Sequence, residues 1–416
     1  MHADRRWRVI NVAVFFGLAF YCVYYLTAFR FGTLFTDESR LVDFLQWHYF
    51  PPLILHHLEY PSVAFDQWTL PFPYLPSAVA MFMPLSALPR AVAFGLWHVL
   101  QAASLMIVLQ ASIKLGGIAR LPARYLIGLA AVLATGNPLG WDFRTHNNNV
   151  IYLAMIMAAL ISRQVWLSAI LIGLSANLKL YSGPLVAVFL WRREYRLAIA
   201  VTVAGLAIAI VLPILVFGFS GFIALLVGWV GQVNFHPPPG RPAVLPPDSF
   251  LLSAATVLGV EAASRSATTL LHFCQAVWLA VLAAYFIMAT RVGAAAPDSR
   301  ARLADVCVIL LAPLPFSHYF APYHAVPLLP AYVLLLAAAA NESEPLRLRV
   351  IAGGAIALAQ LMLYANPNWQ FRGAVYFITF VAVTVALGVL RRAYSQRTQE
   401  AASCPSPSTA SRTATR

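Results

Sequence analysis

The chain has 416 residues, of which 61% are hydrophobic and 10% are charged. Soluble domains carry about 25% charged residues, so this composition excludes a soluble globular protein and requires lipid as the solvent. The net charge of +13 does not indicate a nucleic-acid partner, because the arginines stand at the ends of apolar runs, where the positive-inside rule places cytoplasmic anchors. Four cysteines without Cys-x-x-Cys spacing indicate neither a disulfide nor a cysteine metal site.

The first apolar run, Val9–Phe29, is long enough to cross a ~30 Å hydrocarbon layer and too long for the apolar region of a signal peptide. We interpret it as a retained span that leads outward. Residues 30–71 then form an outer loop between spans 1 and 2. Within it, Leu41–Phe50 and Leu53–Leu58 are expected as two short interfacial helices, because aromatic residues alternate there with histidine and acidic residues.

Further spans are expected at residues 73–89, 91–113, 122–140, 147–162 and 165–191. The last is either one tilted helix or two short helices broken near Ser182-Gly183-Pro184. One helix is favoured, because five crossings after an outer loop place the basic cluster Arg192–Arg196 in the cytoplasm.

The C-terminal half is expected to span at Leu197–Phe219, His272–Thr290, Leu303–Pro315, Ala321–Ala340, 350–366 and 373–391. Prolines in 234–249 exclude a helical crossing and place that stretch outside. We therefore expect one transmembrane domain, residues 1–391, with an all-α polytopic fold of about 11–13 transmembrane helices. The Ser/Thr/Pro-rich remainder, residues 392–416, is expected to be a disordered cytoplasmic tail.

Seven short segments stand out along the chain. They are Asp43-Phe44, Glu59-Tyr60, Phe72-Pro73-Tyr74-Leu75-Pro76, Pro84-Leu85-Ser86-Ala87-Leu88-Pro89, His146-Asn147-Asn148-Asn149, Gly173 with Lys179-Leu180-Tyr181 and Pro184, and Pro313-Leu314-Pro315-Phe316-Ser317-His318-Tyr319. In this order they resemble the blocks of the polyprenol-phosphate-mannose-dependent mannosyltransferases, glycosyltransferase family 87. The resemblance implies a glycosyltransferase C (GT-C) type fold and a polyprenyl-phosphate sugar as the donor.

Asp43 is the expected catalytic residue. Its place in the first outer loop matches the catalytic aspartate of the family that the chain resembles. The donor carries an activated leaving group, so the enzyme needs a base that takes the proton of the acceptor hydroxyl. A lone carboxylate suits inversion, since a retaining double displacement needs a second, nucleophilic carboxylate. The alternatives are Asp37 or Glu38 as the base, and a helix-capping role for Asp43.

Lys179 and His318 are expected to bind the donor phosphate. Lys179 lies in an apolar segment, where an unpaired ammonium costs ~2.5–3.5 kcal/mol, so it should face a wet cavity or a phosphate. His318 stands on the outer side between two spans and can donate to a phosphate or sugar oxygen. The alternatives are a lysine that snorkels to the interface and a packing histidine.

Asn147 and Asn149 offer neutral donors and acceptors for sugar hydroxyls, although asparagines also mark helix starts. The resemblance adds Tyr74 and Tyr319 to the sugar or acceptor site. Trp47, Trp68 and Trp369 are expected in the aromatic belt rather than on a sugar. No metal and no cofactor are expected, because the outer segments contain neither a Cys/His cluster nor an Asp-x-Asp motif.

These expectations describe a membrane enzyme that transfers a hexose, mannose by default, with inversion on the periplasmic face of a bacterial-type inner membrane. Its partners would be membrane lipids, the polyprenyl-phosphate sugar and a glycolipid or glycan acceptor, with no nucleic acid. One rival is a secondary transporter or flippase, which should show paired repeats and matched ionisable residues at mid-bilayer. Another is an O-antigen polymerase or ligase, whose main polar loop would come late in the chain.

Overall fold

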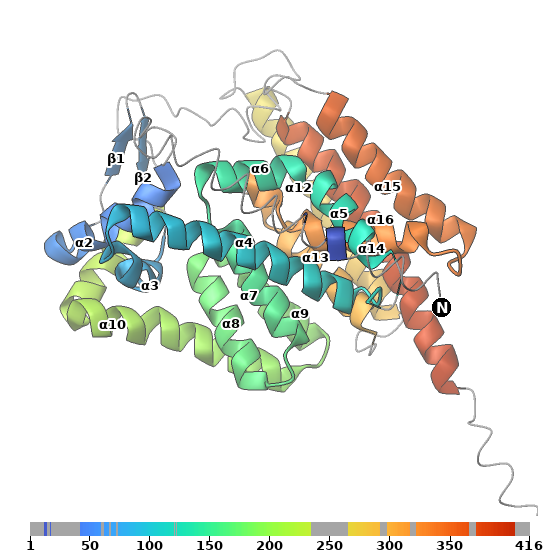
Figure 1. Ribbon diagram of the computed structural model, residues 1–416, viewed down its shortest axis with the longest axis horizontal. Helices are drawn as coiled ribbons and strands as arrows, with labels where there is room; N and C mark the ends of the chain where they lie inside the picture. The colour runs from blue at the N-terminus through green and yellow to red at the C-terminus, as the bar shows by residue number, and fades with distance from the viewer. Residues whose placement is uncertain are drawn as a thin grey trace, which may run out of the picture.

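The computed structural model is a bundle of helices with one small hairpin (Figure 1). It describes residues 12–14, 17, 42–59, 62–65, 68–71, 74–119, 121, 123–233, 265–291, 298–316, 322–365 and 372–403. The elements are α2 (Val42–His57), β1 (Ser62–Phe65), β2 (Trp68–Pro71), α3 (Pro76–Ser86), α4 (Arg90–Leu115), α5 (Arg124–Ala134), α6 (Gly136–Thr145), α7 (Asn149–Ile161), α8 (Val165–Leu178), η2 (Leu180–Ser182), α9 (Leu185–Trp191), α10 (Tyr195–Val233), α12 (Arg265–Arg291), α13 (Ser299–Leu311), η3 (Leu314–Phe316), η4 (Pro322–Ala325), α14 (Leu328–Ala340), α15 (Leu346–Ala365) and α16 (Arg372–Ser403). The all-α polytopic class predicted from the sequence is confirmed; the antiparallel β1–β2 pair, with Ser62 opposite Pro71, is a local addition in the outer loop.

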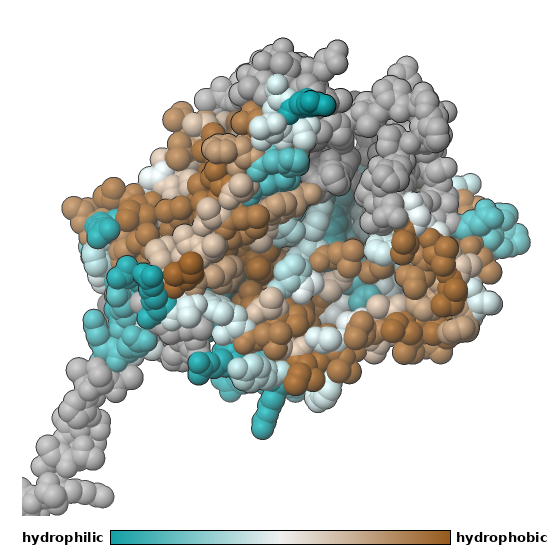
Figure 2. Space-filling model, turned by 180° about the vertical axis from the view of Figure 1, so that it is seen from behind, coloured by the Kyte–Doolittle hydropathy of each residue, from teal (hydrophilic) through white to brown (hydrophobic). Residues whose placement is uncertain are grey.

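Four of the described helices are long and apolar enough to cross a membrane: Arg90–Leu115, Tyr195–Gly231, Arg265–Arg291 and Gly373–Glu400. Apolar side chains on α10 are directed outward, and Leu215 is 77% exposed. On the face shown in Figure 2, brown apolar residues cover most of the described surface and polar residues gather toward its edges. Such a surface needs lipid around it, so the chain is a multi-pass membrane protein. The count of 11–13 crossings stays a prediction.

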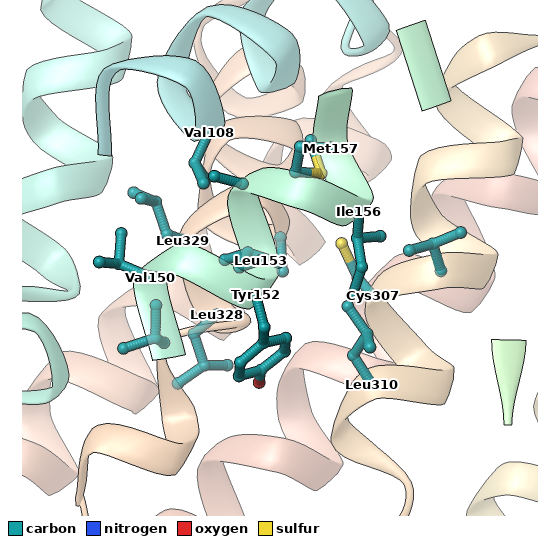
Figure 3. Packing of buried hydrophobic residues seen from close by; sticks show 14 of the residues in the cluster. Val108, Val150, Tyr152, Leu153, Ile156, Met157, Cys307, Leu310, Leu328 and Leu329 are labelled. Carbon is teal, nitrogen blue, oxygen red and sulfur yellow. The ribbon is translucent and has the colours of Figure 1, made fainter. Parts of the chain in front are cut away.

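Helix α7 lies in the middle of the bundle, and its apolar side chains form the core (Figure 3). Leu153, Ile156 and Met157 are buried. They pack beside Val108 of α4, Cys307 and Leu310 of α13, and Leu328 and Leu329 of α14. Because α7 is apolar on every side, it is enclosed by other helices. Its packing against α4, α13 and α14 fixes the positions of its two ends.

The outer-loop segment differs from the prediction of two interfacial helices, because α2 is one helix that includes Pro51 and Pro52. Phe44 and Trp47 are fully buried, and the Trp47 ring lies 3.9 Å from that of Tyr74 and 4.2 Å from that of Phe82. This aromatic packing against α3 holds the helix together where the two prolines remove backbone donors. The prediction of Trp47 in the aromatic belt is therefore wrong, and those of Trp68 and Trp369 fall on side chains outside the described part.

Two expected spans are broken. Residues 122–140 form α5 and the start of α6, and residues 165–191 form α8, the turn η2 and α9. The preference for a single helix over 165–191 is wrong, because Lys179 is extended (φ −144°, ψ 115°) and Pro184 lacks a backbone donor. The Ser182 hydroxyl donates to the Lys179 carbonyl at 2.9 Å, and the Ser175 hydroxyl donates to Ser182 Oγ at 2.9 Å. These hydrogen bonds give the Lys179 carbonyl and the two serine hydroxyls a partner at the break.

The C-terminal half matches the expected spans more closely, although the expected span Ala321–Ala340 is divided into η4 and α14 by a turn at Val326 and Pro327. The expected span Leu197–Phe219 lies within α10, which bends at Gly218 (φ 73°), where the left-handed backbone favours glycine. In contrast to the expected tail from residue 392, α16 continues to Ser403. Residues 404–416 lie outside the described part.

Helix α16 is held by a buried ionic group that we call the Asp305 cluster: Asp305, Arg192, Arg391 and Tyr285. The Asp305 carboxylate forms ion pairs with Arg192 Nη1 and Arg391 Nε, the latter at 3.1 Å. It also accepts the Tyr285 hydroxyl at 2.8 Å. The cluster joins α12, α13 and α16 to the short connection between α9 and α10, which is why the helix does not end at residue 391.

Candidate functional site

Helices α7 and α8 form an antiparallel hairpin that brings the predicted polar residues to one end. The two helices have 13 and 14 residues and are joined by Ser162–Gln164, so Asn149 at the start of α7 and Leu178 at the end of α8 lie at the same end. The Ser168 hydroxyl donates to the Ala159 carbonyl at 2.8 Å across the turn. The helix dipoles then favour a carboxylate near the start of α7 and a cation near the end of α8.

A close helix crossing fixes the end of α8. A Cβ on Gly173 would lie 3.0 Å from the Gly205 nitrogen, so α8 and α10 are in backbone contact there. Four residues on, Asn177 Nδ2 donates to the carbonyls of Gly173 (2.8 Å) and Gly205 (3.0 Å). The Ser77 hydroxyl of α3 donates to Asn177 Oδ1 at 2.6 Å. Asn177 thus joins three helices two residues before Lys179.

Lys179 lies at the C-cap of α8 and is 9% exposed. Its Nζ lies 5.5 Å from the centroid of the Tyr323 ring on η4, a cation–π geometry. The sequence contains two lysines, and the other, Lys114, is exposed at the end of α4. A buried ammonium at a helix break is therefore a specific feature of this position, because the chain uses arginine elsewhere.

The segment between α6 and α7 has a strained backbone. His146 adopts the left-handed conformation (φ 56°, ψ 36°), which is uncommon for a residue with a Cβ. Two side chains of α4 hold the segment: Trp97 Nε1 donates to the His146 carbonyl at 3.0 Å, and Gln101 Nε2 donates to the Asn147 carbonyl at 2.8 Å. Strain of this kind persists only where the surroundings determine it, and it gathers at functional sites.

Asp142 was missed in the sequence. Its carboxylate is fully buried and accepts hydrogen bonds from Asn149 Nδ2 (2.7 Å), the Asn149 backbone N–H (3.2 Å) and the Val150 backbone N–H (3.1 Å). Asn149 Nδ2 also donates to Asn147 Oδ1 at 2.9 Å. A signal was available, because Asp142 is the one acidic residue between Asp66 and Glu194. The sequence prediction considered only the acidic residues of the outer loop, and Asp142 lies outside that loop.

The electrostatics join Asp142 to Lys179. Burial raises the pKa of Asp142 to about 6, and the hydrogen bonds from Asn149 and Val150 together with the charge of Lys179 oppose that rise. Helix α6 is among neither the long nor the short apolar helices of the described chain. At neutral pH the site therefore contains a carboxylate and an ammonium.

Histidine and tyrosine rings cover the lysine side of this region. The His324 ring is 5.5 Å from that of Tyr181 and 4.6 Å from that of Tyr323, and His324 is buried. We call Asp142, Asn147, Asn149, Lys179 and His324 the polar cluster. It gathers residues from α6, α7, the end of α8 and η4.

The structure brings three predicted site residues, Asn147, Asn149 and Lys179, into this cluster. Tyr74 lies instead in the aromatic packing between α2 and α3. Asp43 is the second residue of α2, but its side chain lies outside the described part, as do His318 and Tyr319. Among the described residues no three His, Cys, Asp or Glu side chains gather as metal ligands.

Comparison with known proteins places this arrangement in a family. Residues 72–317 match glycosyltransferase family 87. A polyprenol-phosphate-mannose-dependent alpha-(1-2)-phosphatidylinositol pentamannoside mannosyltransferase of Mycolicibacterium smegmatis is 31% identical over 139 residues, which cover 33% of this chain and 34% of the relative. A protein of the same name from Mycobacterium tuberculosis is 26% identical over 335 residues, 77% of this chain and 72% of the relative. No solved structure matches the chain. The matched segment contains the whole polar cluster apart from His324, and the chain belongs to glycosyltransferase family 87.

Proposed function

We propose that the protein transfers a hexose, mannose by default, from a polyprenyl-phosphate donor to a glycolipid or glycan acceptor, with inversion, on the periplasmic face of a bacterial inner membrane. The observation that carries this proposal is the buried Lys179 ammonium, which stands at a helix break beside Asp142 and the first turn of α7 in a family 87 chain. The names of the mycobacterial relatives supply the donor class.

The leaving group in such a transfer is a lipid phosphate, whose negative charge grows as the bond to the anomeric carbon breaks. A preorganised cation in a water-poor site stabilises that charge more strongly than it would in water. Lys179 is preorganised by the α8–α10 crossing and by Asn177, because its backbone cannot shift without moving α3 and α10. We assign it to the donor phosphate, with His318 as a second donor.

The base must reach the acceptor hydroxyl. Asp142 is poorly suited, since both of its oxygens already accept hydrogen bonds. We therefore keep Asp43 as the base and place the attack on the anomeric carbon opposite the phosphate. Asn147 and Asn149 are assigned to the hexose hydroxyls, and Tyr319 to the acceptor side.

The test compares membranes that contain the wild type, Asp43→Asn or Glu59→Gln, each supplied with labelled polyprenyl-phosphate mannose. Glu59 is an exposed acid in the same outer loop and serves as the matched control. We expect transfer into lipid or polymer products by the wild type and Glu59→Gln, and a large loss with Asp43→Asn. Equal transfer by all three would remove Asp43 from its role. Movement of label into sealed vesicles without a new glycosidic bond would instead favour a transporter.

A further inference from the structure

Asp142 carries more interactions than the proposed reaction uses. One carboxylate accepts from the Asn149 side chain and from the first turn of α7, and its charge interacts with that of Lys179, the buried one of the two lysines. We propose that Asp142 is a positioning residue of the transfer site, which holds Asn147 and Asn149 in place and is the counter-ion of Lys179 until the donor phosphate replaces it. This inference rests on the proposed function.

The first role follows from the hydrogen bonds. Asn149 Nδ2 is shared between Asp142 Oδ1 at 2.7 Å and Asn147 Oδ1 at 2.9 Å, so a single carboxylate fixes both amides. It also satisfies N–H groups that begin α7, which have no partner within their own helix. Without the carboxylate, the two asparagine side chains would turn, although the backbone of His146 and Asn147 would still be held by Trp97 and Gln101.

The second role follows from charge. An ammonium that is 9% exposed needs compensating groups around it, and the Tyr323 ring is one of them. The Asp142 carboxylate is another group whose charge interacts with that ammonium. When a phosphate enters, Lys179 has two anions near it, and the repulsion between carboxylate and phosphate weakens donor binding. Neutralising Asp142 should therefore tighten the donor and impair catalysis at once.

Acid pH provides that neutralisation without a mutation. The pKa of Asp142 is about 6, and a polyprenyl-phosphate mannose is a phosphodiester that stays a monoanion from pH 5 to 8. As pH falls through 6, the donor should bind more tightly while turnover falls, because a protonated carboxyl no longer accepts from both Asn149 and Val150. By linkage, donor binding in turn raises the pKa of Asp142.

Other titratable groups stand on the elements around α6. They are Tyr152 on α7, Lys179 and Tyr181 at the end of α8 and on η2, Tyr323 and His324 on η4, His98 on α4, Arg124 and Tyr125 on α5, Asp43, His48, His56 and His57 on α2, and Arg144 and His146 on α6 and at its end. A matched variant is therefore needed to assign the titration to Asp142.

The experiment measures donor Kd and kcat for labelled polyprenyl-phosphate mannose between pH 5 and 8 in the wild type, Asp142→Asn, Asp142→Glu and Asn149→Ala. For Asp142→Asn we expect a donor Kd about five- to tenfold lower than that of the wild type at pH 7.5, with a low kcat and no dependence of Kd on pH. Asp142→Glu keeps the charge, so its Kd and pH trend should follow the wild type while kcat falls. Asn149→Ala loses turnover and keeps the pH trend of Kd.

Asp305→Asn is the control for a carboxylate whose role is only structural. It should reduce the yield of folded protein and leave Kd, kcat per folded molecule and their pH dependence unchanged. If Asp142→Asn fails to fold, a wild-type Kd that does not change from pH 7.5 to 5.5 overturns the proposal, and so does a fall in the wild-type Kd that Asp142→Glu does not share. A wild type that binds and transfers the donor while Asp142→Asn behaves like Asp305→Asn also overturns it, and the proposed function survives. A wild type that binds no donor at any pH contradicts both.

Discussion

Among the residues that the structure describes, two carboxylates are fully buried, and they differ in how their charge is balanced. Asp305 pairs with two guanidinium groups and a tyrosine hydroxyl, which come from helices across the C-terminal half. Asp142 accepts from uncharged N–H groups of its own neighbourhood and shares the field of one ammonium. The Asp305 charge is compensated by direct ion pairs, whereas Asp142 has neutral hydrogen-bond donors and the charge of one lysine. The comparison separates a group that holds the fold from one that prepares a site.

The largest effect is expected from Asp305→Ala. The substitution leaves Arg192 and Arg391 buried without their shared anion, so the free energy of unfolding should fall by about 3–5 kcal/mol. Thermal unfolding in detergent measures this loss. Arg397→Ala is the control, because the Arg397–Glu344 pair is partly exposed and should contribute about 0.2–1 kcal/mol. Equal effects of the two changes would mean that the Asp305 cluster does not hold the helices.

Lys179→Met tests the second region of the comparison, the polar cluster. The methionine keeps the length and apolar character of the stem and removes the ammonium, so transfer from polyprenyl-phosphate mannose should fall by about 10²–10³-fold. Folding should be retained, because Asp142 keeps its hydrogen bonds from Asn149 and Val150 without the ammonium. Lys114→Met, at the exposed lysine, should transfer at the wild-type rate. A loss in both variants, or in neither, would contradict a phosphate role for Lys179.

Gly173→Ala tests how the site lysine is held. The new Cβ would lie 3.0 Å from the Gly205 nitrogen and 3.2 Å from the Ala204 carbonyl carbon, and backbone atoms cannot move aside as side chains do. We expect about 1–3 kcal/mol of destabilisation and a reduced transfer rate. Gly95→Ala in α4, where nothing lies within 4 Å, should be neutral or stabilising. Comparable unfolding temperatures for the two would rule out the close crossing as a constraint.

The smallest effect is expected from Ser77→Ala. It removes the hydroxyl that donates to Asn177 Oδ1, which should cost about 0.5–1.5 kcal/mol and raise the donor KM slightly, because Asn177 stands two residues before Lys179. Ser86→Ala is the control in the same helix, since that hydroxyl bonds only to the Met83 carbonyl at 2.8 Å. A change in KM with Ser86→Ala as large as that with Ser77→Ala would mean that the position of Asn177 does not influence the site.

The long spans could be predicted from the sequence because the bilayer sets their length. The expected runs 91–113, Leu197–Phe219 and His272–Thr290 lie within α4, α10 and α12. The breaks in the expected spans could not be predicted from the sequence, because they depend on contacts between distant residues. Whether residues 165–191 continue as one helix is decided by bonds such as Ser175–Ser182 and by the crossing with α10, which hydropathy does not contain.

The candidate site was predicted in part. Asn147, Asn149 and Lys179 came from a family resemblance, and the short turn at Ser162–Gln164 supplies the physical reason that they meet. Asp142 was within reach of sequence reasoning as an isolated acid in an apolar stretch. The burial of Tyr74 could not be predicted from the sequence, since a tyrosine before a span is equally compatible with a wet loop and with an aromatic core. The predictions for Asp43, His318 and Tyr319 stay predictions.

The position of Arg391 on α16 has a consequence for how the protein is made. Asp305 leaves the ribosome 86 residues before Arg391, which at a synthesis rate of ~5–20 residues per second corresponds to roughly 4–17 s. During that interval Arg192 is the only arginine of the cluster that Asp305 can meet. The nascent chain therefore lacks the second arginine of the Asp305 cluster until α16 has been synthesised.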